Sequence, residues 1–208
     1  METALNLISI LLVLSVGVVS PGPSFILVAR TAVAISRLAA VSSALGMAAG
    51  ATVLCIAALL GLHALLHQIP AAAVALRVVG GAYLLYLAFG AWRGARLPIE
   101  LAGDAGSSAD RLPRHFTLAA ATMLSNPKAA VQYGVIFAAM LPRSPSVALV
   151  AALPPSIFAL EAGWYLIVAF ALSAPGPRSR YLQAKAAIDR TAGVILGLLG
   201  VRLLLSFG

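Results

Sequence analysis

Long apolar runs constrain this chain more than any other feature. Of its 208 residues, 62% are hydrophobic and 10% are charged. A water-soluble domain carries about 25% charged residues, so the charges here are too few to cover a hydrated surface. A helix needs roughly 20 apolar residues to cross a bilayer. The runs therefore predict an integral membrane protein built as one compact transmembrane domain.

Six apolar segments fill most of the sequence. Membrane β-strands would alternate apolar and polar residues, whereas these segments are apolar on all sides, so helices are predicted. The expected spans are Leu5–Ala29, Leu38–Leu62, Ala71–Trp92, Phe116–Leu141, Val147–Leu172 and Ile188–Phe207. The stretch 93–115 is rich in Gly, Ser, Asp and Arg and is predicted to be a cytoplasmic loop. The first segment carries Glu2 and no basic residue before it, so we expect a mature helix rather than a signal peptide.

The basic residues divide unevenly between the two sides that six spans define. The chain contains 14 Lys and Arg residues and has a net charge of +8. Ten lie on connections of one side: Arg30, Arg37, Arg93, Arg96, Arg111, Arg114, Arg178, Arg180, Lys185 and Arg190. Three lie on the other side: Arg77, Arg143 and Arg202. Since Lys and Arg favour the cytoplasm, both termini are predicted to face outward, and no nucleic-acid partner is expected.

Two helix-breaking motifs stand at matching positions in the two halves of the chain. Three spans precede the polar loop and three follow it, and an odd number of spans per half inverts the second half. The first span of each half contains a proline motif, Ser20-Pro21-Gly22-Pro23-Ser24 or Ser125-Asn126-Pro127-Lys128. Matching interruptions of this kind point to the midplane site of a secondary transporter.

The predicted fold is therefore all-α. We expect six transmembrane helices as two inverted three-helix repeats, at about residues 1–100 and 116–208, with helices 1 and 4 broken at the Pro motifs.

The breaks have a specific chemistry. Asn is favoured as the residue that caps a helix N-terminus and Pro as the first helical residue, so Asn126-Pro127 predicts a helix that starts again inside the membrane. Such a start presents N–H groups and a positive dipole end, which suit a carboxylate. Gly22 would let the backbone bend and approach a ligand. The alternative is a kink without a binding role, since Pro and Gly are common in membrane helices.

Two charged residues fall deep inside the expected spans. Lys128 lies roughly 18 Å into its span at 1.5 Å per residue, where a charge is costly and normally faces a cavity. Gln132 follows four residues later on the same helical face. Glu161 could pair with Lys128, receive a substrate ammonium or carry a proton, and a purely structural role stays open. The predicted substrate-binding residues are Ser20, Pro21, Gly22, Pro23, Ser24, Asn126, Pro127, Lys128 and Gln132, with Glu161 for proton coupling.

Other motifs give weaker signals. His63 and His67 are spaced like some metal ligands, but no carboxylate or thiol accompanies them, so no metal and no other cofactor is predicted. No phosphate-binding loop is present, which argues against ATP-driven pumping by this chain alone. Gly-x-x-x-Gly pairs permit close helix contacts; packing within one chain is the expected use, and a homodimer stays open. The pairs are Gly46 with Gly50 and Gly193 with Gly197.

Several stretches resemble the LysE/RhtB family of bacterial amino-acid exporters over essentially the whole length. They read SPGPSFILV, ALGMAAG, GGAYLLYLAFGAWR, LSNPKAAVQY, WYLIVAFALS and GLLGVRLLLS. The resemblance implies efflux of amino acids or related metabolites across the bacterial inner membrane, driven by the proton gradient. It also implies a functional core at Pro21, Gly22, Pro23, Asn126, Pro127 and Lys128.

Two other function classes remain as alternatives. A membrane-embedded enzyme would need a base beside a nucleophile or a set of metal ligands, and the spans offer only Glu161 and Lys128. An accessory membrane subunit would need no charged residue at mid-depth. Activity that survives loss of the membrane gradient would favour the enzyme, and a folded Lys128→Met protein with all function intact would favour the accessory subunit.

The charge bias generates a test of topology. A reporter domain fused after Gly208 is expected to behave as periplasmic, because the cytoplasmic side collects the basic connections. The measurement is the activity of a reporter that works only outside the cytoplasm. A cytoplasmic C-terminus would contradict the six-span arrangement.

Overall fold

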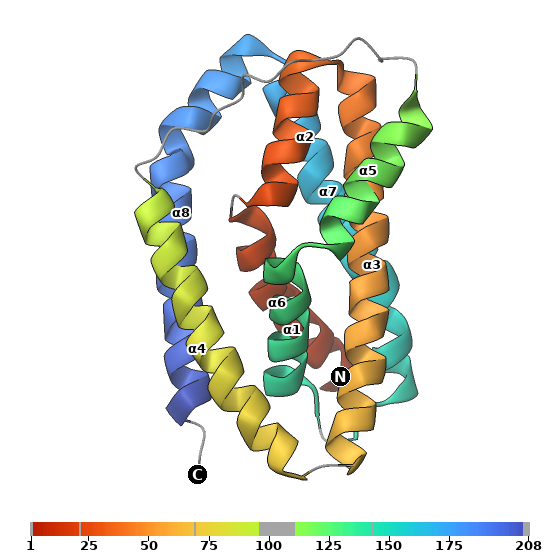
Figure 1. The fold of residues 1–208 in the computed structure, drawn as a ribbon, viewed down its shortest axis with the longest axis vertical. Coiled ribbons are helices and arrows are strands. Elements are labelled where there is room, and N and C mark those ends of the chain that lie inside the picture. The colour runs from red at the N-terminus through yellow and green to blue at the C-terminus, as the bar shows by residue number, and fades with distance from the viewer. Residues whose placement is uncertain (1, 21, 69, 96–110, 143, 206–208) are drawn as a thin grey trace.

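The computed structural model of the chain describes residues 2–20, 22–68, 70–95, 111–142 and 144–205. These residues form helices and no strand, so the predicted all-α class is confirmed for them (Figure 1). The helices are α1 (Glu2–Val19), α2 (Pro23–Ala34), α3 (Arg37–Gln68), α4 (Pro70–Gly94), α5 (Leu112–Leu124), α6 (Pro127–Met140), α7 (Val147–Leu172) and α8 (Pro175–Leu205). Most of the expected loop, residues 96–110, lies outside the described residues.

Length and composition identify membrane-crossing helices within this set. Among the described residues, three stretches are long and apolar enough to cross a bilayer: Glu2–Val19, Arg37–Gly61 and Val147–Leu172. Large apolar side chains such as Leu12, Leu60 and Ile167 lie on the outside of the molecule. An apolar exterior combined with apolar spans defines an α-helical membrane protein.

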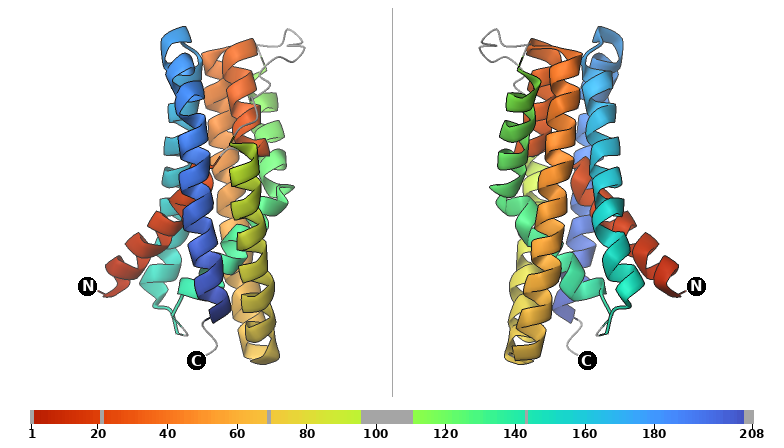
Figure 2. Two further views of the ribbon diagram at one scale, coloured as in Figure 1. Left: turned by 90° about the vertical axis from the view of Figure 1, so that its left-hand side faces the viewer. Right: turned by 90° about the vertical axis from the view of Figure 1, so that its right-hand side faces the viewer.

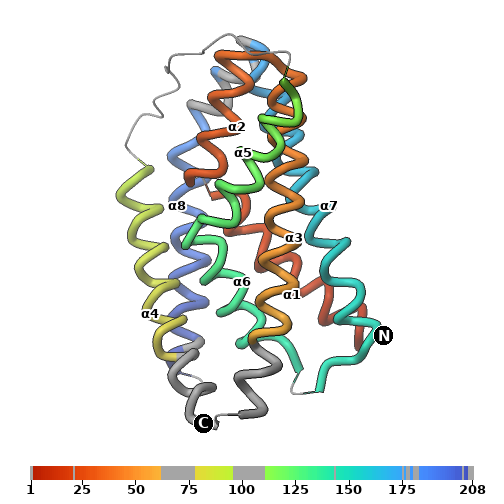
Figure 3. The backbone as a smooth tube through the Cα atoms, turned by 45° about the vertical axis from the view of Figure 1, so that its right-hand side comes forward, coloured from red at the N-terminus to blue at the C-terminus, as the bar shows by residue number. Residues whose placement is uncertain are grey.

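The helices run along one long axis (Figure 1). In that view α1, α2, α4 and α7 run upward, whereas α3, α5, α6 and α8 run downward. The α2–α3 and α7–α8 connections lie at the upper end, and the α3–α4 and α6–α7 connections lie at the lower end, where α8 also ends. In Figure 2, α1 leans away from the axis toward the N-terminus. The α1–α2 and α5–α6 junctions both lie near the middle of the molecule's length (Figure 3).

The last helix differs from the expected span. Its apolar segment was predicted to begin at Ile188, whereas α8 begins at Pro175. A hydropathy pattern marks the part of a helix that lipid can cover, while backbone hydrogen bonding continues into charged residues outside it. Lys185 therefore belongs to a helix rather than to a connection.

Small residues allow two pairs of helices to pack closely. A Cβ atom added at Gly46 of α3 would overlap the carbonyl group of Phe116 in α5, and one added at Gly50 would lie 2.8 Å from the carbonyl oxygen of Ala120. On α8, a Cβ atom added at Gly193 would lie 2.5 Å from Trp92 Cδ1 of α4. Both Gly-x-x-x-Gly pairs therefore serve contacts within this chain.

The close approach of α3 and α5 predicts opposite effects of one substitution at two sites. Gly46→Ala is expected to destabilise the fold by about 1–3 kcal/mol, because backbone must move to admit the methyl group. Gly61 of the same helix has no neighbour within 4 Å of an added Cβ among the described residues. Gly61→Ala is expected to be neutral or to stabilise by up to about 1 kcal/mol. Thermal unfolding in detergent measures both, and equal shifts would contradict the packing.

Candidate functional site

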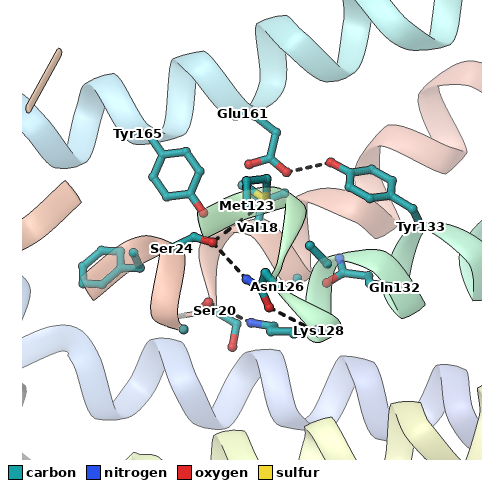
Figure 4. A pocket seen from close by; sticks show the side chains of 14 residues that line it. Val18, Ser20, Ser24, Met123, Asn126, Lys128, Gln132, Tyr133, Glu161 and Tyr165 are labelled. Atoms are coloured by element: carbon teal, nitrogen blue, oxygen red, sulfur yellow. Dashed lines mark hydrogen bonds between the residues drawn. The ribbon is translucent and has the colours of Figure 1, made fainter. Parts of the chain in front are cut away.

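A small cavity lies at the two helix junctions in the middle of the molecule (Figure 4). Its volume is ≈ 30 Å³, and its walls come from α1, α2, α5, α6 and α7. Seven of the residues predicted from sequence line it: Ser20, Gly22, Ser24, Asn126, Lys128, Gln132 and Glu161. The fold thus brings the two proline motifs and the deep carboxylate to one place.

Asn126 joins the starts of two helices. As the capping residue of α6, it accepts a hydrogen bond at Oδ1 from the backbone N–H of Lys128, at 3.0 Å. Its Nδ2 atom donates to Ser24 Oγ in the first turn of α2, at 2.9 Å. Ser24 and Asn126 are both buried. One amide side chain therefore holds the N-termini of α2 and α6 together across 102 residues of sequence.

Lys128 reaches from the start of α6 to the end of α1. Its Nζ atom donates to the carbonyl oxygen of Ser20 at 3.0 Å, directly after the last residue of α1. A cation is favoured there, because carbonyl groups at a helix C-terminus carry partial negative charge. The side chain is half-buried, so its ammonium stands at the edge of the cavity.

Gly22 lies beside the Lys128 side chain. A Cβ atom added at Gly22 would lie 3.6 Å from both Cδ and Nζ of Lys128, which is ordinary contact. The backbone of Gly22 is extended, with φ −145° and ψ −170°, a conformation open to any residue. The conformation at this position therefore does not require glycine, and the expected approach of the Gly22 backbone to a ligand stays a prediction. What the position lacks is a side chain beside the ammonium.

The prolines start the two helices and do not reach into the cavity. Pro23 is the first residue of α2 and Pro127 the first residue of α6, and both are exposed. Proline is favoured at this position because its fixed φ suits the helix and its missing N–H has no helical partner to lose. Pro21, also predicted as a site residue, lies outside the described residues.

Glu161 is held by a tyrosine from α6. Its Oε1 atom accepts a hydrogen bond from Tyr133 OH at 2.7 Å, and the residue is 3% exposed. Its Oε2 atom has no hydrogen-bond partner among the described residues. Glu161 and Lys128 line the same cavity without forming an ion pair, although the carboxylate attracts the ammonium electrostatically. The cavity thus contains one cation and one buried acid with an unused oxygen.

Gln132 is bonded to the first helix. Its Nε2 atom donates to the carbonyl oxygen of Leu14 in α1, at 3.3 Å. Gly17 lies against the same side chain, and a Cβ atom added at Gly17 would overlap it. Gln132 therefore fills the space between α1 and α6 at one end of the cavity.

Sequence reasoning did not include two tyrosines in the site. Tyr133 binds Glu161, and Tyr165 points its hydroxyl toward Ser24 (Figure 4). Tyr165 lies four residues after Glu161, so both occupy one face of α7, and that spacing was the available signal.

A buried ion pair on α8 was also missed. Lys185 Nζ lies 2.7 Å from Asp189 Oδ2 and donates to the carbonyl oxygen of Gly94, at the end of α4, also at 2.7 Å. The two residues are 8% and 2% exposed, and Asp189 Oδ1 has no hydrogen-bond partner among the described residues. Asp189 also acts electrostatically on Lys128. The spacing of four residues was the signal for this pair.

No group of three or more metal-ligating side chains occurs among the described residues. The side chains of His63 and His67 lie outside them, so the weak metal motif seen in the sequence is not tested.

The family match and two of the named relatives point to the same class of protein, membrane translocators. Residues 15–206 match the LysE type translocator family. The threonine efflux protein of Salmonella typhimurium is 32% identical over 200 residues, covering 92% of this chain and 93% of that protein. The threonine efflux protein of Escherichia coli is 29% identical over 192 residues, with 92% and 93% coverage. The uncharacterized membrane protein YahN of Escherichia coli is 30% identical over 186 residues, with 89% and 82% coverage. No solved structure matches the chain.

The chain is an α-helical membrane protein with a charged cavity at its centre, and the family match identifies its class as a transporter. The chain belongs to the LysE type translocator family. The resemblance predicted from the sequence is confirmed, and the chain is a transporter rather than an enzyme.

The ion pair on α8 predicts a non-additive pair of substitutions. Asp189→Leu is expected to destabilise the protein by about 3–5 kcal/mol, because it leaves the Lys185 ammonium buried without a carboxylate. Replacing both residues, as Lys185→Met with Asp189→Leu, is expected to recover most of that loss. Thermal unfolding of Asp189→Leu, of Lys185→Met and of the double variant measures the difference. A double variant as unstable as the sum of both single variants would contradict a coupled pair.

Proposed function

We propose that this transporter exports an amino acid across the bacterial inner membrane by antiport with protons, binding the substrate between the starts of α2 and α6. The observation that carries the proposal is that Lys128 and Glu161 line one cavity at two adjoining helix N-termini. Two relatives are named threonine efflux proteins, which favours a small amino acid as substrate.

In this proposal, α1 with α2 and α5 with α6 each form one interrupted span, so the chain crosses the membrane six times. Each half then consists of one interrupted span followed by two long helices. The first half runs up, down and up in Figure 1, and the second half runs down, up and down. This reversal supports two inverted repeats within one transporter domain. The basic connections then lie in the cytoplasm, with both termini outside.

The substrate carboxylate would bind where helix dipoles and a cation converge. The N-termini of α2 and α6 present backbone N–H groups that have no partner within their own helices. Lys128 can leave the Ser20 carbonyl oxygen and donate to a carboxylate, since a charge-assisted bond is stronger than one to a neutral oxygen. Ser20, Ser24, Asn126 and Gln132 would surround the bound group.

The substrate ammonium would bind Glu161. Its Oε2 atom has no hydrogen-bond partner in the described part of the chain, and Tyr133 orients the carboxylate through Oε1. Protonation of Glu161 removes the negative charge that attracts the substrate ammonium. The protonated carboxyl group therefore binds the ammonium more weakly than the carboxylate does. Competition at Glu161 therefore gives exchange of a proton for an amino acid.

Binding requires the cavity to widen. A volume of ≈ 30 Å³ is about the share of one water molecule, whereas ligand pockets measure roughly 300–1,000 Å³. Separation of the two junctions at the Asn126–Ser24 hydrogen bond would provide the space. In this proposal the structure is an occluded state without substrate, between two open states.

Loss of the cation is the first test. Lys128→Ala is expected to reduce efflux of preloaded threonine and other small amino acids at least about 100-fold, since it removes the charged donor for the carboxylate. Lys128→Arg is expected to restore little, because a planar guanidinium differs in shape and hydration. Efflux from loaded vesicles is measured alongside thermal unfolding. Normal efflux by a folded Lys128→Ala protein would remove Lys128 from the site.

Proton coupling is tested at Glu161. Glu161→Gln is expected to abolish uphill export driven by a pH gradient, because an amide cannot take up and release a proton as a carboxyl group does. Some downhill exchange is expected to remain. The measurement compares gradient-driven export with amino-acid counterflow in the same vesicles. Uphill export equal to that of the wild type would exclude Glu161 as the proton carrier.

A further inference from the structure

A second, larger cavity lies between α1, α4, α6 and α8. Its volume is ≈ 390 Å³, against ≈ 30 Å³ for the central cavity. A volume of this size falls within the range of sites for small ligands. This cavity lies outside the proposed substrate site.

The two cavities follow one another along the same two helices. On α1, Val13 lines the larger cavity, while Gly17 lines the central one. On α6, Val135 and Ile136 line the larger cavity, while Gln132 lines the central one. Three or four residues are one helical turn, about 5 Å along the axis. The larger cavity therefore begins one turn beyond the central cavity, on the side of the chain termini.

The side chain of Gln132 lies at the level where the linings of the two cavities meet along α1 and α6. Its side chain lies against Gly17 and donates to the Leu14 carbonyl oxygen, which fixes it across the space between α1 and α6. A bond of 3.3 Å to a neutral oxygen is long for an amide donor. The absence of a side chain at Gly17 is what admits the amide to this place.

The larger cavity carries polar groups that suit an amino acid. Asn6, Ser9 and Arg202 line it beside apolar side chains. Arg202 stands near the end of α8, on the side where the sequence places few basic residues. A guanidinium presents several donors in a plane and binds a carboxylate with two parallel hydrogen bonds. Asn6 and Ser9 add a donor and an acceptor for the remaining groups.

We infer that this cavity is the outward release vestibule of the transporter. It is filled with water and opens to the outside, Arg202 receives the carboxylate of the departing amino acid, and Gln132 is the plug that separates it from the central site. The inference rests on the proposed export function, and it adds a second binding site and a barrier to that function.

Neighbouring residues of α1 provide a matched test of water access. Val13 lines the cavity, whereas Leu12 is 63% exposed on the outer surface of the helix bundle. The chain's single cysteine, Cys55, is buried and gives a low background. In right-side-out vesicles, Val13→Cys is expected to react with a charged, membrane-impermeant thiol reagent at least about tenfold faster than Leu12→Cys, because thiolates form in water and not in lipid. Equal rates, or reaction only in inside-out vesicles, would overturn the vestibule.

The same reagent tests the plug. Ala129 lines the central cavity, so Ala129→Cys is expected to resist labelling from outside. Combined with Gln132→Ala, it is expected to be labelled at least about tenfold faster, since the barrier to water is removed. Unchanged labelling in the combined variant would show that another group closes the passage.

Arg202 is tested by the affinity for amino acid added outside. Arg202→Gln is expected to raise the external concentration for half-maximal counterflow about tenfold, which corresponds to about 1.4 kcal/mol. Arg190, exposed on the same helix and outside the cavity lining, provides the control Arg190→Gln, for which no change is expected. An unchanged value for Arg202→Gln would overturn the carboxylate assignment. Absence of counterflow in the wild type would instead contradict the export function, while the labelling rates would still decide whether the cavity opens outward.

Discussion

The hydrogen bond from Asn126 to Ser24 is the contact on which the centre of this molecule depends. Helix ends near the middle of a membrane are stable only if protein, water or ligand satisfies their polar groups. Asn126 satisfies one donor of α6 with its carbonyl oxygen and links to the start of α2 with its amide nitrogen. Two helix N-termini are thereby fixed side by side, and the resulting positive field is what makes an anion site there physically reasonable.

The two charged side chains at this centre, Lys128 and Glu161, do not form an ion pair with each other. Lys128 bonds a backbone carbonyl oxygen rather than a carboxylate, and Glu161 keeps one oxygen without a partner among the described residues. Lys185 and Asp189, in contrast, form a close ion pair that ties α8 to the end of α4. A fully paired cluster would be rigid and would have little to offer a ligand. The incomplete pairing at Lys128 and Glu161 fits a site whose partners change during transport.

Much of the site was predictable because it follows from local chemistry. Asn126-Pro127 predicts a helix start, since capping and the first helical residue depend on adjacent residues alone. The depth of Lys128 and Glu161 follows from counting along apolar spans. Tyr133, Tyr165 and the Lys185–Asp189 pair were missed, because tyrosines and paired charges are common in helices and their role depends on which helix faces them. The backbone of Gly22 is extended and open to any residue, so a preference for glycine there would depend on what lies beside it rather than on its conformation.

The sequence by itself determined that the chain is a helical membrane protein and that a helix starts at Pro127, because apolar length and proline chemistry act over short distances. It also determined the family, through motifs spread along the whole chain. Only the tertiary structure decided that Asn126 reaches Ser24, that Glu161 bonds Tyr133, and that Gln132 bonds the Leu14 carbonyl oxygen of α1. These contacts join residues up to 118 positions apart, so they depend on how the helices pack rather than on any local pattern.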